Sequence, residues 1–212
     1  MARNEKTVWN RFALIYDRFM KRDEMLYREI VDLTVPRLKP DSPVLEIATG
    51  TGMIALGLAG YAGHIEAVDF SPAMIAKARE KAHRLGVTDV TFQVQDAYDL
   101  AFAPGSFDVV IIANTLHIMP RPERALEEIR RVLSPGGVLI APTYIHAGNT
   151  RAVILSRLMA VTGFRAYHKW DQQGYHRFLE ENGFSIEESE VLEARFPLAY
   201  VVAKPMPSAR EK

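Results

Sequence analysis

The chain contains no cysteine, carries no net charge and has no long apolar segment. Without cysteine it can form no disulfide, no thiolate metal site and no cysteine nucleophile. Its 26 basic residues balance 26 acidic ones, so no long-range attraction draws it to the phosphate backbone of nucleic acid. No window reaches the apolar length of a membrane span, and the N-terminus lacks a signal-peptide core. We therefore expect a cytoplasmic protein that binds no nucleic acid.

The length and composition of the chain are typical of one compact α/β domain. The 212 residues are 48% hydrophobic and 25% charged, which is typical of a globular fold. Strand and helix patterns alternate from Val44 to Ile140, which predicts a right-handed βαβ series and a parallel sheet. Near the C-terminus, two strand patterns at 184–192 and 196–203 are joined by a short link and must pair antiparallel. The expected fold is a Rossmann-like doubly wound sheet, mostly parallel, with a C-terminal antiparallel hairpin strand.

We expect this single domain, residues 1–212, to have four parts. They are an N-terminal helical cap at 1–40, a cofactor-binding core at 41–145, a helical lid insertion at 146–170, and a C-terminal helix and hairpin at 171–204. The cap is expected to be one helix between Val8 and Leu26, because apolar residues recur there at helical spacing.

The most informative segment is a short buried strand from Val44 that runs into a glycine-rich turn. Gly50 and Gly52 let the backbone approach a ligand, and the helix that follows can offer N–H groups to an anion. With Ala55 they also satisfy the dinucleotide fingerprint, so an NAD(P)-dependent oxidoreductase is one alternative. Glu46 argues against it, because a pyrophosphate would repel this carboxylate whereas an ammonium or sulfonium group would attract it. The other interpretation is that Glu46 only caps a neighbouring N–H group.

Two more acids stand at the ends of the next two strands. Asp69 lies roughly twenty residues past the glycines, where doubly wound folds place an acid on the ribose hydroxyls of a cofactor. It could also help to cap the helix that Ser71 and Pro72 begin. Asp96 follows the strand at 90–94. Three acids at three successive strand ends, with Glu46 the first, form a more specific signal than the glycines alone.

These features resemble the class I S-adenosylmethionine (SAM)-dependent methyltransferases. The resemblance covers the segment VLEIATGTG, the strand-end acids, and a strand, leucine–histidine pair, amphipathic helix and LSPGG turn, from about residue 44 to residue 144. More narrowly, the chain is similar to ubiquinone/menaquinone C-methyltransferases and phospholipid N-methyltransferases. It departs from the pattern at Ala48, where the first glycine of the motif usually stands. Since alanine disfavours a positive φ, we expect a turn that alanine permits.

The resemblance implies a methyl donor, SAM, a product, S-adenosylhomocysteine (SAH), and transfer by in-line displacement to a small-molecule or lipid-like acceptor. By the same resemblance Asp96 and Ala97 hold the adenine, Phe70 and Met74 are candidates to cover its faces, and Tyr16 approaches the methionine end. No metal is expected. The predicted cofactor-binding residues are Tyr16, Glu46, Ala48, Thr49, Gly50, Gly52, Asp69, Phe70, Met74, Asp96, Ala97 and Asn114.

The acceptor side is less specific. The insertion from Asn149 to Trp170 combines apolar and basic residues, and we expect a lid over the acceptor, although a peripheral membrane contact or a dimer contact would fit too. The chain is expected to be a monomer or a homodimer. His117 is the candidate catalytic base, with an orienting role as the alternative. A SAM-binding regulatory protein without catalysis remains a further hypothesis. The predicted substrate-binding residues are Tyr144, His146 and Tyr167.

Overall fold

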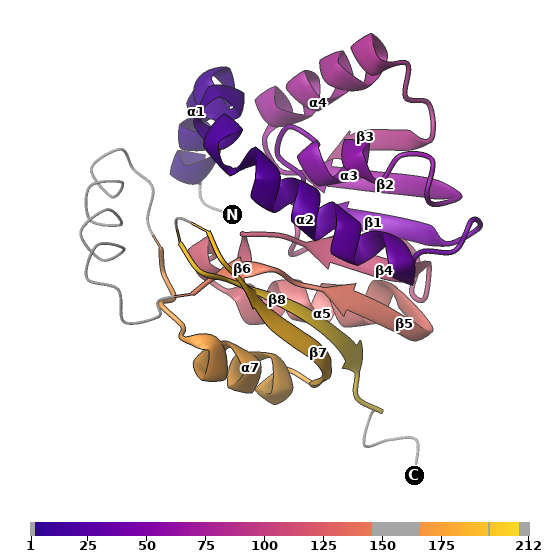
Figure 1. The fold of residues 1–212 in the computed structure, drawn as a ribbon, viewed down its shortest axis with the longest axis vertical. Coiled ribbons are helices and arrows are strands. Elements are labelled where there is room, and N and C mark those ends of the chain that lie inside the picture. The colour runs from indigo at the N-terminus through magenta and orange to yellow at the C-terminus, as the bar shows by residue number, and fades with distance from the viewer. Residues whose placement is uncertain (1–2, 146–165, 195, 208–212) are drawn as a thin grey trace.

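The computed structural model describes residues 3–145, 166–194 and 196–207, which contain one sheet of eight strands (Figure 1). The strand order is β3-β2-β1-β4-β5-β8-β6, with β7 paired to β8. The neighbouring pairs from β3 to β5 are parallel, and β8 runs antiparallel to β5, β6 and β7. The mostly parallel doubly wound sheet with an antiparallel C-terminal hairpin strand is thereby confirmed. The strands are β1 Pro43–Ile47, β2 His64–Asp69, β3 Val90–Val94, β4 Phe107–Ile112, β5 Leu133–Ile140, β6 Thr143–Tyr144, β7 Phe184–Leu192 and β8 Leu198–Pro205.

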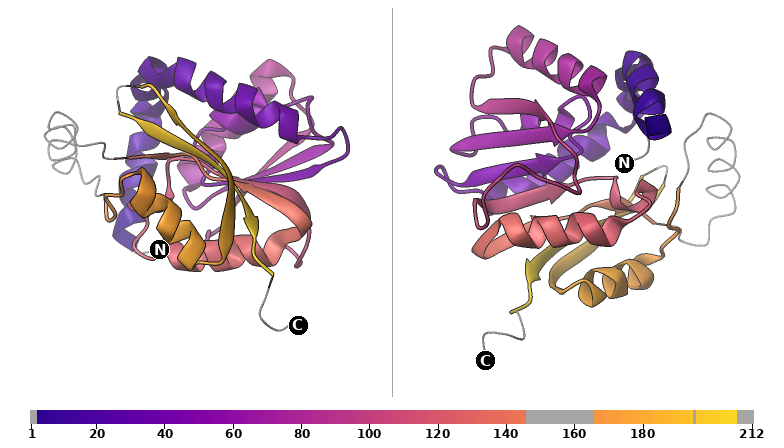
Figure 2. Two further views of the ribbon diagram at one scale, coloured as in Figure 1. Left: turned by 60° about the horizontal axis from the view of Figure 1, so that its bottom comes forward. Right: turned by 180° about the vertical axis from the view of Figure 1, so that it is seen from behind.

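Helices cover both faces of this sheet (Figure 2). On one face α2, α3 and α4 pack against side chains such as Val44, and on the other face α5 and α7 pack against side chains such as Leu45. Consecutive strand residues point to opposite faces, so apolar runs such as that of β1 supply both cores at once. Within the described residues, none of the helices is long and apolar enough to cross a membrane. The α-helices are α1 Arg3–Met20, α2 Glu24–Thr34, α3 Met53–Gly57, α4 Pro72–Leu85, α5 Pro122–Val132 and α7 Gln172–Glu181.

The N-terminal region differs from the single helix expected between Val8 and Leu26. It forms two helices, α1 and α2, which are separated by a 3-10 turn at Lys21–Asp23. Periodicity does not reveal this break, because the apolar spacing continues across the turn. Helix α2 is part of the core layer, since its Ile30 is fully buried against the sheet.

The start of α4 brings a polar loop to the carboxyl edge of the sheet. Ser71 caps the helix, its hydroxyl accepting from the Met74 N–H at 3.3 Å, and Pro72 occupies the first helical position. Gly86, with φ 69°, ends the helix. This cap fixes the chain immediately after β2 and so fixes the position of Asp69.

Candidate cofactor-binding and active site

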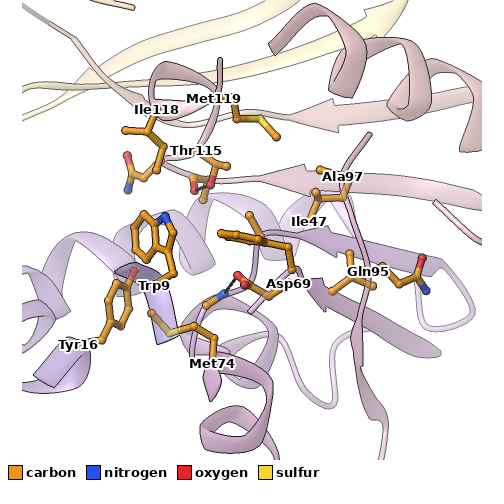
Figure 3. Close-up of a pocket in the computed structure, with 16 residues that line it drawn as sticks. Trp9, Tyr16, Ile47, Asp69, Met74, Gln95, Ala97, Thr115, Ile118 and Met119 are labelled. Atoms are coloured by element: carbon orange, nitrogen blue, oxygen red, sulfur yellow. Dashed lines mark hydrogen bonds between the residues drawn. The ribbon is translucent and has the colours of Figure 1, made fainter. Parts of the chain in front are cut away.

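A cavity lies at the carboxyl edge of the sheet, where β1, β2, β3 and β4 end (Figure 3). It contains about 630 Å³ of empty space, part of it open to solvent, and α1 lies along one side of it. Figure 3 shows Trp9 and Tyr16 at one end of the cavity, Gln95 and Ala97 at the other, and Asp69 between them. Ligands of open α/β sheets bind at this edge, so the cavity is the candidate cofactor site.

Asp69 is the acid at the centre of the cavity. It is 6% exposed, and its Oδ2 accepts from the Gly50 N–H at 2.9 Å while Oδ1 accepts from the Ser71 N–H at 2.8 Å. Burial raises the pKa of Asp69 to about 6, and the two N–H donors oppose this rise. At neutral pH the carboxylate is ionised, and each oxygen retains capacity to accept a further hydroxyl. The site can therefore bind a vicinal diol.

Glu46 occupies a different position, behind the glycine turn. It is 3% exposed, and its Oε2 accepts from the Thr49 hydroxyl at 2.6 Å and from the Ala55 N–H at 2.9 Å. Burial raises its pKa to about 8, although these two bonds lower it. Neither Glu46 nor Thr49 lines the cavity. These hydrogen bonds agree with the interpretation that Glu46 caps neighbouring groups. A direct contact of Glu46 or Thr49 with the cofactor stays a prediction.

These carboxylates also bear on the dinucleotide alternative. The N–H of Gly50 bonds Asp69 and the N–H of Ala55 bonds Glu46. An anionic pyrophosphate at the turn would need free N–H groups, and it would meet the ionised carboxylate of Asp69 instead. The local geometry disfavours NAD(P).

The turn itself corrects one expectation. Ala48 adopts φ 57°, although we expected a conformation comfortable for alanine. The left-handed region costs a non-glycine residue roughly 1–2 kcal/mol. Next to it, Thr49 donates its N–H to the Val68 carbonyl at 3.0 Å and its hydroxyl to Glu46, and these bonds hold the turn in place. Gly52, with φ 79°, has no room for a side chain, because a Cβ would lie 2.8 Å from the Phe92 ring.

After β3, the residues on either side of Asp96 line the cavity, but Asp96 itself does not. Gln95 and Ala97 line it, whereas Asp96 accepts from the Tyr98 N–H at 3.1 Å and is not a lining residue. Phe70 and Met74, the predicted candidates to cover the adenine faces, also line the cavity. The structure thus brings Ala97, Phe70 and Met74 together and leaves Asp96 beside them, and the adenine contacts stay predictions.

Helix α1 holds two aromatic rings against the cavity. The Trp9 and Tyr16 ring centroids are 6.5 Å apart, and the Tyr16 ring lies 3.7 Å from the place where a Cβ on Gly50 would stand. Aromatic faces attract a cation such as a sulfonium group. The Asp17 carboxylate anchors the helix, because it accepts from the Thr51 hydroxyl at 2.6 Å and from Lys81 Nζ at 2.5 Å. Sequence patterns gave no signal for this anchor.

The lining as a whole suits an adenosyl sulfonium amino acid. Among the described lining residues, Asp69 is the one with a charged side chain, and the rest are apolar or aromatic residues, two amides and the hydroxyl of Thr115. Over the whole part of the chain that the structure describes, no group of three or more His, Cys, Asp or Glu side chains could hold a metal ion. An acid, aromatic rings and a close glycine turn fit a cationic nucleoside.

Comparison with known proteins agrees with this geometry. A family profile described as a methyltransferase domain matches residues 45–141. A demethylmenaquinone methyltransferase of Thermus thermophilus is 44% identical over 53% of this chain and 51% of its own length. A ubiquinone/menaquinone biosynthesis C-methyltransferase of Rhizobium meliloti is 32% identical over 77% of this chain and 66% of its own length. The chain belongs to the class I SAM-dependent methyltransferases.

Solved structures agree with the fold. The magnesium protoporphyrin IX methyltransferase of Synechocystis, crystallised with SAH, superposes with a TM-score of 0.69 at 19% identity, over 85% of this chain and 82% of that one. The chain spans about half or less of the length of the first three curated relatives that it matches, 51%, 39% and 48%. SAM is the methyl donor of this family, and the residues that line the cavity around Asp69 fit this cofactor.

Three of the predicted acceptor-side residues, His117, Tyr144 and Tyr167, lie next to one another, although they do not line the cavity. His117 is 7% exposed, its Nδ1 lies 3.0 Å from the Thr143 hydroxyl, and its ring meets Tyr144 edge-on at 6.1 Å. Tyr167 donates its N–H to the His117 carbonyl at 3.0 Å. His146 and nearly all of the predicted lid, residues 146–165, lie outside the described part of the chain.

One lining residue, Asn114, has a partner that the sequence did not suggest. Asn114 follows β4 with φ 53°, and its Nδ2 donates to the Tyr27 hydroxyl at 3.3 Å. Its Oδ1 is buried and has no hydrogen-bond partner in the structure. Tyr27 is on α2 and reads in sequence as an ordinary core aromatic.

Proposed function

We propose that the protein transfers a methyl group from SAM to a small-molecule or lipid-like acceptor. The observation that supports this most strongly is the position of Asp69, a buried carboxylate in a cavity that is otherwise uncharged over the described residues. With the ribose on Asp69, the adenine would lie toward Gln95 and Ala97 and the methionine end toward Trp9 and Tyr16 (Figure 3).

The chemistry supplied by bound SAM is a methyl group already activated on a sulfonium. The chain's own task is then to hold the acceptor atom in line, about 3–3.5 Å from that methyl carbon, and to keep water away. Trp9 and Tyr16 from α1, with Ile118 and Met119 after β4, supply a largely apolar wall for this purpose.

An acceptor that loses a proton on methylation needs a base. His117 remains our candidate, and the Thr143 hydroxyl, 3.0 Å from Nδ1, would fix its ring. Tyr144 and Tyr167, which lie beside His117, are proposed to contact the acceptor. His117 is buried and does not line the cavity, so this role requires the acceptor to reach it beside Tyr144.

For the acceptor we favour an apolar ring compound of the quinol type. The apolar wall supports this, as do the names of the Thermus and Rhizobium relatives, which specify quinone methylation. A phospholipid amine is the second acceptor to test.

The test is a transfer assay with methyl-labelled SAM and the purified full chain. Demethylated quinols, phosphatidylethanolamine vesicles and small thiols serve as separate acceptors. Asp69→Ala should abolish most transfer. The matched control is Asp89→Ala, because Asp89 also accepts a backbone N–H, from Gly60 at 2.6 Å, but precedes β3 at the opposite edge of the sheet.

Three outcomes separate the hypotheses. Transfer to one acceptor that depends on Asp69 and not on Asp89 supports the proposal. Tight SAH binding without transfer to any acceptor would favour the regulatory alternative. Binding of NAD in place of SAH would favour the oxidoreductase.

A further inference from the structure

Helix α1 is fastened to the protein through a cluster of three polar side chains that lies outside the cavity. Asp17 of α1 accepts from the Thr51 hydroxyl at 2.6 Å and from Lys81 Nζ of α4 at 2.5 Å. Lys81 also donates to the Thr51 oxygen at 2.8 Å, so that this hydroxyl donates once and accepts once. None of the three residues lines the cavity.

Thr51 places this cluster directly on the glycine turn. It stands between Gly50 and Gly52 and is 0% exposed, so solvent does not reach its hydroxyl to replace a lost partner. The preceding residue, Gly50, donates its N–H to Asp69 at 2.9 Å. The position of α1 is therefore tied to the turn that holds the central acid of the cavity.

A second hydrogen bond ties α1 to the other loop that holds Asp69. The Ser71 hydroxyl donates to Asn10 Oδ1 at 2.6 Å, while the Ser71 N–H donates to Asp69 at 2.8 Å. Both loops that position Asp69 thus also bind α1.

Each attachment point on α1 directly follows an aromatic residue of the cavity lining. Trp9 precedes Asn10 and Tyr16 precedes Asp17, and the two aromatic residues point toward the cavity (Figure 3). Both pairs are separated by seven positions, about two helical turns, so the pattern repeats along α1. Detaching α1 at Asp17 would also withdraw the Tyr16 ring, which lies 3.7 Å from the place of a Cβ on Gly50.

The Asp17–Lys81 ion pair is more shielded from water than another ion pair of α4, Lys77–Glu80. The Lys81 side chain is 19% exposed and that of Asp17 44%, against 39% and 61% for Lys77 and Glu80. Exposed pairs contribute little to stability, whereas charge-assisted hydrogen bonds that are partly shielded contribute more. Lys77 is therefore a matched control for Lys81 on the same helix.

We propose that Lys81 is a positioning residue that controls how long the methyl donor stays bound. Through Asp17 it holds α1, and with it Trp9 and Tyr16, against the occupied cavity, so that release of SAM or SAH requires the cluster to break. This inference rests on the proposed function and adds to it a determinant of cofactor release that lies outside the cavity.

Stopped-flow fluorescence on the full chain measures the two rate constants of SAH binding. Trp9 lines the cavity and Trp170, the second tryptophan, does not, so the ligand-dependent emission reports on Trp9. The observed rate as a function of SAH concentration gives association and dissociation. Lys81→Met should speed dissociation about 3–10-fold, as expected for a partly shielded charge-assisted bond, and association should not slow. Lys81→Arg, which keeps the cation, should release SAH at nearly the wild-type rate.

Two comparisons separate the cluster from a general effect of charge on α4. Lys77→Met removes the more exposed pair with Glu80, whose atoms are 3.0 Å apart, and should leave both rate constants unchanged. Asp17→Asn should speed release as Lys81→Met does. The double variant should release SAH no faster than the faster single variant, because both changes break the same cluster.

Unchanged dissociation in both Lys81→Met and Asp17→Asn, or a loss of affinity that lies in association alone, would overturn the inference while the proposed function stands. Equal acceleration by Lys77→Met would overturn it too, as would additive effects of the two cluster variants. Failure of the wild type to bind SAH at all would instead overturn the proposed function, and this inference with it.

Discussion

Replacing Glu46 by glutamine probes the buried acid behind the glycine turn. The glutamine amide oxygen can accept from the Thr49 hydroxyl and the Ala55 N–H as the carboxylate does. The variant therefore keeps the caps and removes only the titratable charge. Any change in stability with pH then reports the ionisation of Glu46.

The expected magnitude follows from the pKa of about 8 that burial gives Glu46, against an ordinary value of 4.5. Between these values the folded state keeps the proton that the unfolded state has released, so stability falls as pH rises. The steepest slope is about 1.4 kcal/mol per pH unit. Glu46→Gln lacks this loss, so its advantage over the wild type should grow by about 2–4 kcal/mol between pH 5 and pH 8.

Urea unfolding of both proteins at pH 5, 6, 7 and 8 measures this difference directly. Equal m-values would show that the denatured states are comparable. A difference that stays constant with pH, or that favours the wild type as pH rises, would refute the reasoning. It would mean that Glu46 is ionised in the folded protein and has a cationic partner.

Three further predictions concern the turn and Asp69. Asp69→Ala should weaken SAH binding by about 1.5–3 kcal/mol. Wild-type affinity for SAH should fall as pH drops below about 6, because the carboxylate, whose pKa is about 6, takes up a proton. Calorimetry across pH checks both effects, and unchanged affinity would restrict Asp69 to capping. Ala48→Gly should raise the free energy of unfolding by about 0.5–1 kcal/mol, since φ 57° strains alanine; a loss in urea denaturation would count against that strain. Gly52→Ala should lower it by about 1–3 kcal/mol, because φ is 79° and the Phe92 ring stands 2.8 Å from the new Cβ; an unchanged midpoint would contradict the close contact.

The parts of this fold that depend on local pattern could be predicted from sequence. Alternating strands and helices fixed the parallel sheet, and the spacing from Gly50 placed Asp69 at the edge where the cavity lies. Asp96 and Ala97 were expected to hold the adenine; Ala97 lines the cavity together with Gln95, whereas Asp96 does not line it. The direction in which a chain leaves a strand depends on its tertiary contacts, which a local pattern does not contain.

Long-range pairs were beyond a sequence pattern for the same reason. Tyr27 and Asn114 are 87 positions apart, and each looks ordinary in its own segment. The 3-10 turn between α1 and α2 was also missed, because apolar spacing is the same on both sides of it. At Ala48 the structure contradicts the local preference of the residue, because alanine here adopts a left-handed backbone. The hydrogen bonds of the neighbouring Thr49 hold this conformation in place.

The most direct test of the central claim is to titrate SAH and NAD separately into the wild type, Asp69→Ala and Asp89→Ala. We predict saturable SAH binding to the wild type and to Asp89→Ala, strongly weakened binding to Asp69→Ala, and no heat from NAD. Binding of NAD without SAH, or SAH affinity that is unchanged in Asp69→Ala, would contradict the assignment of this cavity as the site of the methyl donor.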